Sequence, residues 1–177
     1  KKYVDRSYII RDKGTNRKAF VNRKVSKYQW VDIGSSFIPS SLQAAFLLSQ
    51  LKNGKTITKK RIKIFKIYNN FFQKLKKNRV SFPSINKNNA INGHFYWILI
   101  DQNKRDLFIK NALSKNLELT SHYEPLHVSL AGKKYAITYS NLDNSSFFSK
   151  QLIRIPIHTD MNEKKIKFVI TTLTALL

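Results

Sequence analysis

The stretch Thr58–Lys77, TKKRIKIFKIYNNFFQKLKK, carries the strongest periodic pattern in the chain. Its apolar residues recur at the spacing of one helix face and form a single stripe: Ile64, Phe65, Tyr68, Phe71, Phe72 and Leu75. The lysines of the same stretch fall on the other side of the helical projection. The pattern therefore predicts a long helix with a buried aromatic face and a solvated basic face.

Two helical patterns precede this stretch. Ser40 or Ser41 is a favourable N-cap for an Ala- and Leu-rich helix that ends near Gly54. Further upstream, residues 2–13 predict a modest helix that stops at Gly14, because glycine favours the left-handed cap position. The segment between, residues 14–34, has no regular pattern and is expected to be a long loop of the kind that often carries function.

The second half of the chain alternates short strands with helices. The run HFYWILI, residues 94–100, is apolar enough for a strand covered on both faces. Strands are also expected at 80–82, 117–122 and 154–157, and helices at 107–113, at 144–151 and after Asn162, which is a favourable cap. The sequence thus predicts an α+β fold in which two long helices are followed by a small sheet with flanking helices.

Composition limits the function classes. The chain has 177 residues, a formal net charge of +23 and no cysteine, which excludes disulfides and thiolate metal sites. No signal peptide pattern and no apolar run of about 18 residues is present, so we expect a soluble, cytoplasmic protein with no membrane contact. The charge also suggests nucleic-acid binding, but no aromatic residue is interleaved with the lysines of 58–77 to stack a base.

Three short motifs are candidates for binding chemistry. In SHYEPLH, residues 121–127, Pro125 favours an extended chain that lets His122 and His127 face one pocket. Plain hydrogen bonding by the two imidazoles is the alternative, and a metal site would need a third ligand that the spacing does not offer. In GTNR, Asn16 and Arg17 suit a phosphate or a sugar hydroxyl.

The third motif is Gly34–Ser36, uncharged and close to a helix N-terminus. Free N–H groups and hydroxyls there suit an anion, whereas the alternative is a tightly packed lead-in to an ordinary capped helix. The chain has no P-loop, no dinucleotide fingerprint and no GxSxG elbow, and its ten acidic residues form no convincing pair. Its own residues therefore show no self-sufficient active site.

Four motifs in fixed order resemble the C-terminal half of the DegT/DnrJ/EryC1/StrS sugar aminotransferases, and especially the branch that makes dTDP-4-amino-4,6-dideoxygalactose. They are DKGTNR (12–17), KYQWVDIGSSFIPSSLQAAFLLSQL (27–51), HYEPLH (122–127) and RIPI (154–157). The resemblance implies the type I fold of pyridoxal 5'-phosphate enzymes and a homodimer. Residues 56–177 would be the small C-terminal domain, and residues 1–55 would link it to a large domain upstream of residue 1.

The resemblance also implies a reaction, in which an amino group passes from glutamate to C4 of a dTDP-4-keto-6-deoxyhexose. The lysine that binds the cofactor would lie in the upstream domain, so this chain would be inactive alone. Ser36 matches a position that contacts the cofactor phosphate across the dimer. His122 and His127 match the substrate pocket, and Asn16 and Arg17 match a loop near the nucleotide sugar.

Some positions depart from the family pattern. Ser41 stands where relatives usually carry Glu or Asp, and residues 128–146 lack the glycine-rich character common there. Two other readings therefore remain beside the enzyme, a basic nucleic-acid-binding module and a non-catalytic remnant that keeps only its partner contacts. The enzyme reading predicts no nucleic-acid partner.

Overall fold

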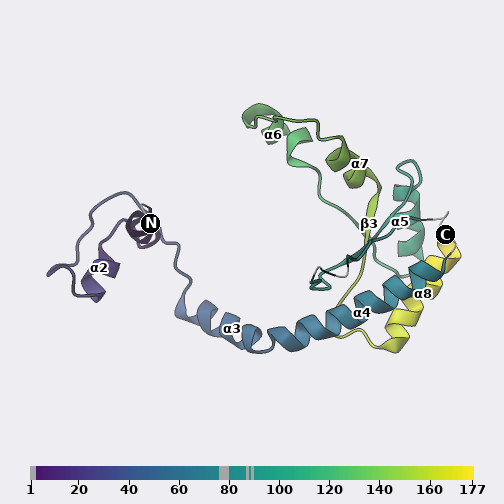
Figure 1. Ribbon diagram of the computed structural model, residues 1–177, viewed down its shortest axis with the longest axis horizontal. Helices are drawn as coiled ribbons and strands as arrows, with labels where there is room; N and C mark the ends of the chain where they lie inside the picture. The colour runs from purple at the N-terminus through teal and green to yellow at the C-terminus, as the bar shows by residue number, and fades with distance from the viewer. Residues whose placement is uncertain (1–2, 76–79, 87, 89) are drawn as a thin grey trace. The chain divides into compact units, whose positions relative to one another are not determined.

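A computed structural model describes residues 3–75, 80–86, 88 and 90–177. The chain divides into two compact units, Lys1–Asn53 and Gly54–Leu177, each with its own internal contacts (Figure 1). The structure places the boundary between the two units after residue 53, two residues before the predicted boundary. Whether residue 56 starts the small domain of a larger enzyme stays a prediction.

The N-terminal unit holds three helices: α1 (Val4–Arg11), α2 (Arg17–Val21) and α3 (Ser41–Lys52). Helix α1 ends at Arg11, two residues before the expected end. Lys13 (φ 62°) and Gly14 (φ 75°) are both left-handed, and the Gly14 N–H donates back to the Ile9 carbonyl at 2.8 Å. The prediction that 14–34 is entirely loop was wrong, since α2 lies within it. A helix of five residues is too short for apolar periodicity to reveal.

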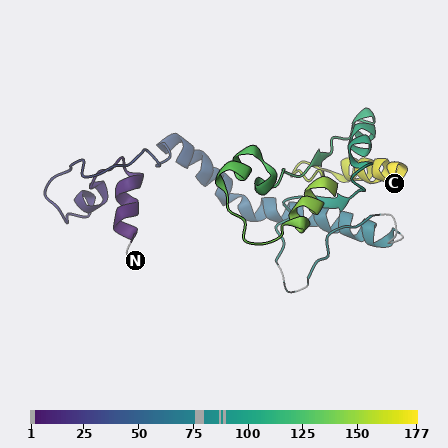
Figure 2. The ribbon, with the colours of Figure 1, turned by 90° about the horizontal axis from the view of Figure 1, so that it is seen from above.

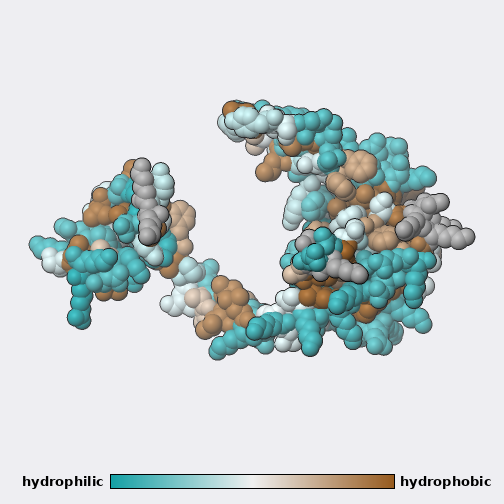
Figure 3. Space-filling view, viewed as in Figure 1, coloured by the Kyte–Doolittle hydropathy of each residue, from teal (hydrophilic) through white to brown (hydrophobic). Residues whose placement is uncertain are grey.

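Helix α3 begins with a reciprocal capping box. Ser40 Oγ accepts from the Gln43 N–H at 3.2 Å, and Gln43 Oε1 accepts from the Ser40 N–H at 2.9 Å, which confirms Ser40 as the cap. No residue of α3 is buried within the described chain. Leu42 is 81% exposed and Phe46 70% exposed, and the apolar surface of α3 is visible in Figure 3. The helix therefore presents a large apolar surface without cover.

The C-terminal unit is organised by α4 (Gly54–Lys74), the helix that the opening stretch predicts. It begins four residues earlier than expected, and its expected end at Lys77 lies outside the described residues. The apolar stripe faces inward, with Ile64, Phe65, Tyr68 and Phe72 buried. Lysines 59, 60, 63 and 66 are exposed, so the described part of the basic face is solvated as predicted.

A three-stranded antiparallel sheet packs against this helix. Its strands are β1 (Tyr96–Leu99), β2 (Thr120–Ser121) and β3 (Leu152–Ile155), in the order β1-β3-β2. All three were expected, but β1 and β2 are shorter and β3 starts two residues earlier than predicted. The segment 80–82 contributes a single bridge, Ser81 to Leu99, instead of a strand.

The apolar pattern overestimates β2 for a physical reason. Leu117 and Leu119 are buried in the core, although neither belongs to the strand. An alternating apolar pattern reports which side chains face the core, and it does not report whether the backbone finds a ladder partner. The prediction for 117–122 is therefore right that Leu117 and Leu119 are buried, but only Thr120 and Ser121 form the strand.

One face of the sheet forms the core of the unit. Tyr96 and Ile98 of β1 and Ile153 and Ile155 of β3 are nearly inaccessible. The helices α4, α5 (Arg105–Ser114) and α8 (Glu163–Leu176) supply most of the side chains that complete this core. Figures 1 and 2 show α4 and α8 running alongside each other, in agreement with their contacts.

The centre of the core is aromatic. The Tyr96 ring lies 4.9 Å from Phe65, 5.8 Å from Tyr68 and 5.5 Å from Phe72, with the Phe72 ring stacked on it. The Tyr68 hydroxyl donates to the Pro156 carbonyl at 3.1 Å, so this buried group is satisfied. Burial raises the pKa of both tyrosines well above the usual value.

The remaining elements lie between β2 and β3 and at the C-terminus. They are the 3₁₀ turn η1 (Leu126–Val128), α6 (Leu130–Tyr135) and α7 (Asp143–Gln151), followed after β3 by α8. Helices α7 and α8 were expected, and Asn162 caps α8 as predicted, accepting from the Lys165 N–H at 3.0 Å. The turn η1 and α6 were missed. Among the described residues, no helix combines the length and apolarity needed to cross a membrane.

The aromatic core supports a first prediction. We expect Phe72→Ala to lower the free energy of unfolding of the C-terminal unit by about 3–5 kcal/mol, because it removes a ring with no exposed surface and leaves a cavity. Phe168→Ala, which removes a ring that is 44% exposed, should cost less than half as much. Denaturant unfolding followed by Trp97 fluorescence in a Trp30→Phe background measures both. Equal losses for the two variants would contradict this assignment of the core.

Candidate functional site

Two of the motifs in the N-terminal unit pair with each other through their backbones. The Lys13 N–H donates to the Ser35 carbonyl at 3.1 Å, and the Ser35 N–H donates to the Ile10 carbonyl at 2.9 Å. Farther along, the Val31 N–H donates to the Gly14 carbonyl at 2.8 Å. The motifs DKGTNR and WVDIGSS, about twenty residues apart in sequence, therefore form one structure, here called the paired loop (residues 9–16 and 29–37).

Two glycines make this pairing possible. A Cβ on Gly14 would lie 1.7 Å from the Asp32 carbonyl oxygen, and one on Gly34 would lie 2.2 Å from the Gly14 nitrogen. Gly14 also has positive φ, where a side chain is strained even in open space. The backbones of the two motifs thus touch at positions that no other residue type fits.

Asn16 closes the paired loop. Its Nδ2 donates to the Lys27 carbonyl at 2.9 Å, and its Oδ1 accepts from the Gln29 N–H at 2.8 Å. The amide therefore joins the two ends of the segment that contains α2. Arg17, the first residue of α2, is exposed. The Asn16 side chain thus holds this loop in place. That Asn16 and Arg17 contact a nucleotide sugar stays a prediction.

Ser36 lies at the exposed end of the paired loop. Its backbone forms an antiparallel bridge with Asp12, whereas its side chain is open to solvent and its hydroxyl has no hydrogen-bond partner among the described residues. It lies four residues before Ser40, the cap of α3. An exposed, unengaged hydroxyl fits one oxygen of a phosphate group, so the residue types present are compatible with the expected cofactor contact.

The two histidines of HYEPLH have different neighbours. Pro125 is extended as predicted, with φ −63° and ψ 138°, and the chain then turns into η1. The His127 Nε2 lies 3.1 Å from Ser146 Oγ of α7. The His122 ring lies 5.9 Å from the ring of Phe95 and 5.7 Å from that of Tyr123, and its Nδ1 is buried with no partner in the described chain. The substrate-binding role of both histidines stays a prediction.

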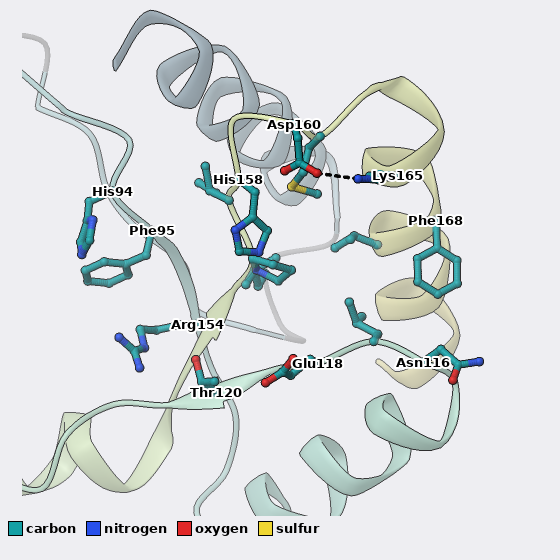
Figure 4. A pocket seen from close by; sticks show the side chains of 16 residues that line it. His94, Phe95, Asn116, Glu118, Thr120, Arg154, His158, Asp160, Lys165 and Phe168 are labelled. Carbon is teal, nitrogen blue, oxygen red and sulfur yellow. Dashed lines mark hydrogen bonds and ion pairs between the residues drawn. The ribbon is translucent and has the colours of Figure 1, made fainter. Parts of the chain in front are cut away.

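A cavity of about 480 Å³ opens in the C-terminal unit, beside β3 and the start of α8 (Figure 4). Arg154 and Thr120 lie at one end of it, and an ion pair between Lys165 Nζ and Asp160 Oδ2, 2.7 Å apart, lies at the other. The hydrogen bond from Lys165 holds the pKa of the Asp160 carboxyl below its usual value.

Reasoning from sequence did not select Arg154 as a site residue. The signal was available, because Arg154 is the only charged residue in the otherwise apolar run LIRIPI. No group of three or more potential metal ligands was found among the described residues. The arrangement therefore offers hydroxyl, imidazole and guanidinium groups for binding.

The basic face of α4 carries no stacking platform. The described aromatic residues of this helix, Phe65, Tyr68, Phe71 and Phe72, are buried or half-buried on the opposite face. Proteins that bind single-stranded nucleic acid combine positive charge with exposed aromatic rings in one groove. The geometry of α4 thus lacks a feature that the nucleic-acid alternative needs.

Comparisons with known proteins bear on the site as a whole. The model of the DegT/DnrJ/EryC1/StrS aminotransferase family matches residues 1–174. A UDP-4-amino-4,6-dideoxy-N-acetyl-beta-L-altrosamine transaminase of Campylobacter jejuni is 27% identical over 98% of this chain and 45% of its own length. An uncharacterised protein of Methanocaldococcus jannaschii is 27% identical over 88% of this chain and 42% of its own. The chain thus spans less than half the length of these curated relatives.

Solved structures show the same fold. A putative sugar aminotransferase of Streptococcus pneumoniae in its PMP form, Spr1654, matches with a TM-score of 0.80 and 19% identity, over 96% of this chain and 43% of its own. Helicobacter pylori PseC, an aminotransferase of pseudoaminic acid biosynthesis, matches with a TM-score of 0.78 and 19% identity, over 96% and 44%. In each case the matched part is less than half of the solved chain.

The glycine contact of the paired loop gives a second prediction. Gly14→Ala should destabilise the paired loop by at least about 1–3 kcal/mol, because the added Cβ meets a backbone oxygen at positive φ. Hydrogen exchange of the Val31 and Asp32 amides, which both donate to the Gly14 carbonyl, should become faster. Gly54→Ala is the matched control, since a Cβ there meets nothing within 4 Å. Unchanged protection in Gly14→Ala would show that the contact is not tight.

Proposed function

Because the chain belongs to the DegT/DnrJ/EryC1/StrS aminotransferase family, we propose that it forms the C-terminal part of a pyridoxal 5'-phosphate-dependent sugar-nucleotide aminotransferase. The observation that carries the proposal is the family match over residues 1–174, which includes the paired loop and the HYEPLH segment. The proposed reaction moves an amino group from glutamate to C4 of a dTDP-4-keto-6-deoxyhexose. The product in the branch that the KGTNR and WVDIGSS motifs resemble would be dTDP-4-amino-4,6-dideoxygalactose, a sugar of enterobacterial common antigen.

The identity of the sugar rests on two sources of support. The Campylobacter relative is named for a UDP-linked 4-amino-4,6-dideoxy sugar, which supports a nucleotide-activated deoxysugar as the substrate class. The choice of dTDP and of the galactose configuration rests on the KGTNR and WVDIGSS motifs alone.

The large domain is the first partner of this chain in the proposal. The relatives are more than twice as long as the matched segment, and the lysine that binds the cofactor is proposed to lie in their additional part. The 177-residue chain alone would then transfer no amino group. When bound, the cofactor supplies the carrier that takes the amino group from the donor and passes it to the sugar.

A second copy of the chain is the other proposed partner. Helix α3 exposes Leu42, Phe46 and Leu51, and the segment after η1 exposes Leu130 and Tyr139, each by more than 60%. Apolar surface of this extent on a folded protein marks a contact surface. Burial against the large domain and the second protomer would account for it, and this role needs no nucleic-acid partner.

The site residues have separate roles in the proposal. The Ser36 hydroxyl donates a hydrogen bond to the cofactor phosphate held by the second protomer, because it is exposed and unengaged in the described chain. Asn16 and Arg17 contact the nucleotide part of the substrate, and His122 and His127 orient the sugar. None of these five residues is proposed to form a covalent bond.

The proposal is tested by completing the enzyme. We expect the chain, produced together with the large domain of a family member, to acquire cofactor absorbance above 320 nm and to aminate a dTDP-4-keto-6-deoxyhexose with glutamate as donor. The chain alone is the control and should do neither. A stable complex that binds the cofactor but aminates no nucleotide-linked keto sugar would refute the function.

The role of Ser36 makes a third prediction in the same complex. Ser36→Ala should weaken cofactor binding about tenfold or more, because a hydrogen bond to a charged group contributes about 1.5–3 kcal/mol. Ser36→Asn should retain most of the affinity, since an amide also donates to phosphate. Ser35→Ala is the matched control, because the backbone of Ser35 makes its contacts in the paired loop. Spectrophotometric titration measures the affinities, and equal values for Ser36→Ala and Ser35→Ala would remove Ser36 from the site.

A further inference from the structure

Arg154 has an unusual position in the C-terminal unit. It lies in β3, the central strand, where it is paired with Trp97 of β1 and Thr120 of β2. Its neighbours Ile153 and Ile155 are buried in the core, so strand alternation directs Arg154 to the opposite face of the sheet. Because β3 is held on both sides, the side chain starts from a rigid backbone.

The guanidinium of Arg154 lies against an aromatic ring and has no counterion among the residues that the structure describes. Its central carbon lies 5.3 Å from the centre of the Tyr123 ring, which is the geometry of a cation–π contact. In the described part of the chain, Arg154 Nε is buried without a hydrogen-bond partner, and no ion pair includes Arg154. An arginine donor removed from water without an acceptor costs about 1–3 kcal/mol, so an acceptor is expected to complete it.

A second unpartnered nitrogen belongs to the same group of side chains. His122 precedes Tyr123, its ring contacts that of Tyr123 at 5.7 Å, and its Nδ1 is also buried without a partner. The only other such atom among the described residues is Arg61 Nε, in α4. Two of the three orphaned polar atoms of the described chain therefore occur where HYEPLH meets β3.

The group lies beside an accessible space. Arg154 and Thr120 line the 480 Å³ cavity, and Figure 4 shows both side chains at its edge, whereas His122 and Tyr123 are not among the lining residues. The carboxylates that share the cavity are Asp160, which is paired with Lys165, and Glu118, which has no partner in the described chain. Neither carboxylate forms an ion pair with Arg154, so the guanidinium can bind an anion from solution.

We propose that Arg154 is an oxyanion-binding residue: its guanidinium, held against Tyr123 beside the His122 ring, donates hydrogen bonds to a carboxylate or phosphate group that enters the cavity. The planar guanidinium suits both groups, because two N–H donors match two oxygens. The inference rests on the proposed function, which supplies two sources of oxyanion. One is the carboxylate of glutamate, and the other is the diphosphate of the nucleotide sugar.

Direct binding to the 177-residue chain provides the first test. The Arg154 Nε–H signal, assigned by its absence in Arg154→Lys, is followed by ¹⁵N-resolved NMR during separate titrations with glutarate and with thymidine diphosphate. We expect one of the two anions to shift this signal and the His122 ring signals together. The anion that does so identifies the source, and the absence of any shift with either anion in the folded chain overturns the proposal.

Variants separate binding from a purely structural role. Arg154→Gln should weaken binding of the effective anion at least tenfold, and Arg154→Lys should recover part of it, because a charge remains without the planar pair of donors. Glu118→Gln should strengthen binding about twofold or more, since it removes a negative charge from the cavity. Unchanged anion affinity in Glu118→Gln would show that the anion does not bind in the cavity, and the proposal fails.

Lys164→Gln is the matched control for net charge. Lys164 is exposed and lies outside the residues that line the cavity. The Lys164→Gln substitution removes one positive charge, as Arg154→Gln does, so an effect of overall charge on anion affinity would appear equally in both variants. Equal loss of affinity in the two variants would show that the anion is attracted by the +23 charge and not by a site.

The completed enzyme distinguishes failure of this inference from failure of the proposed function. If amino transfer occurs, Arg154→Gln should raise the KM for glutamate or for the nucleotide sugar at least tenfold, and the other KM should stay within about twofold. Transfer with both KM values unchanged refutes the inference and leaves the function intact. No transfer by the wild type, with the Arg154 signal still responding to an anion, refutes the function and leaves the binding site intact.

Discussion

The stacking of α4 on the sheet at Tyr96 is the interaction on which the C-terminal unit depends. One phenol ring contacts three aromatic rings of the helix, Phe65, Tyr68 and Phe72, and all four side chains are buried. A sheet with strands of two to four residues has little ladder energy of its own. Burial of aromatic area against α4 therefore keeps β1 and β3 in register, and β3 in turn places Arg154.

The same strand alternation that builds this core produces the candidate site. Residues 153 and 155 point into the core, so residue 154 must point to the other face. A polar side chain on that face needs no loop to position it, because its backbone is fixed by the buried neighbours on the same strand. This explains how a short sheet holds an arginine, and through it Tyr123 of the HYEPLH segment, in a fixed place.

The elements that sequence predicted best are those whose signal is local. The apolar stripe of α4 and the caps Ser40 and Asn162 each depend on a few neighbouring residues, and each was found in the structure. Strand lengths were predicted poorly, because pairing depends on distant partners that the alternation of Leu117 and Leu119 does not reveal. The run LIRIPI marks Arg154 as the one charge among apolar residues, but its lack of a counterion depends on where distant acidic groups lie, and the sequence does not show this.

The uncharged lead-in to α3 has one cause that the structure shows and one that we propose, and they apply to different residues. Backbone contact explains Gly34, where any Cβ would meet the Gly14 nitrogen, without reference to a ligand. It does not explain Ser36, whose side chain is exposed and makes no hydrogen bond in the described chain. In a chain with 33 lysine and arginine residues, an exposed loop position of this kind tolerates a cation. Tight packing therefore accounts for the glycine alone, and the proposed phosphate contact would account for Ser36.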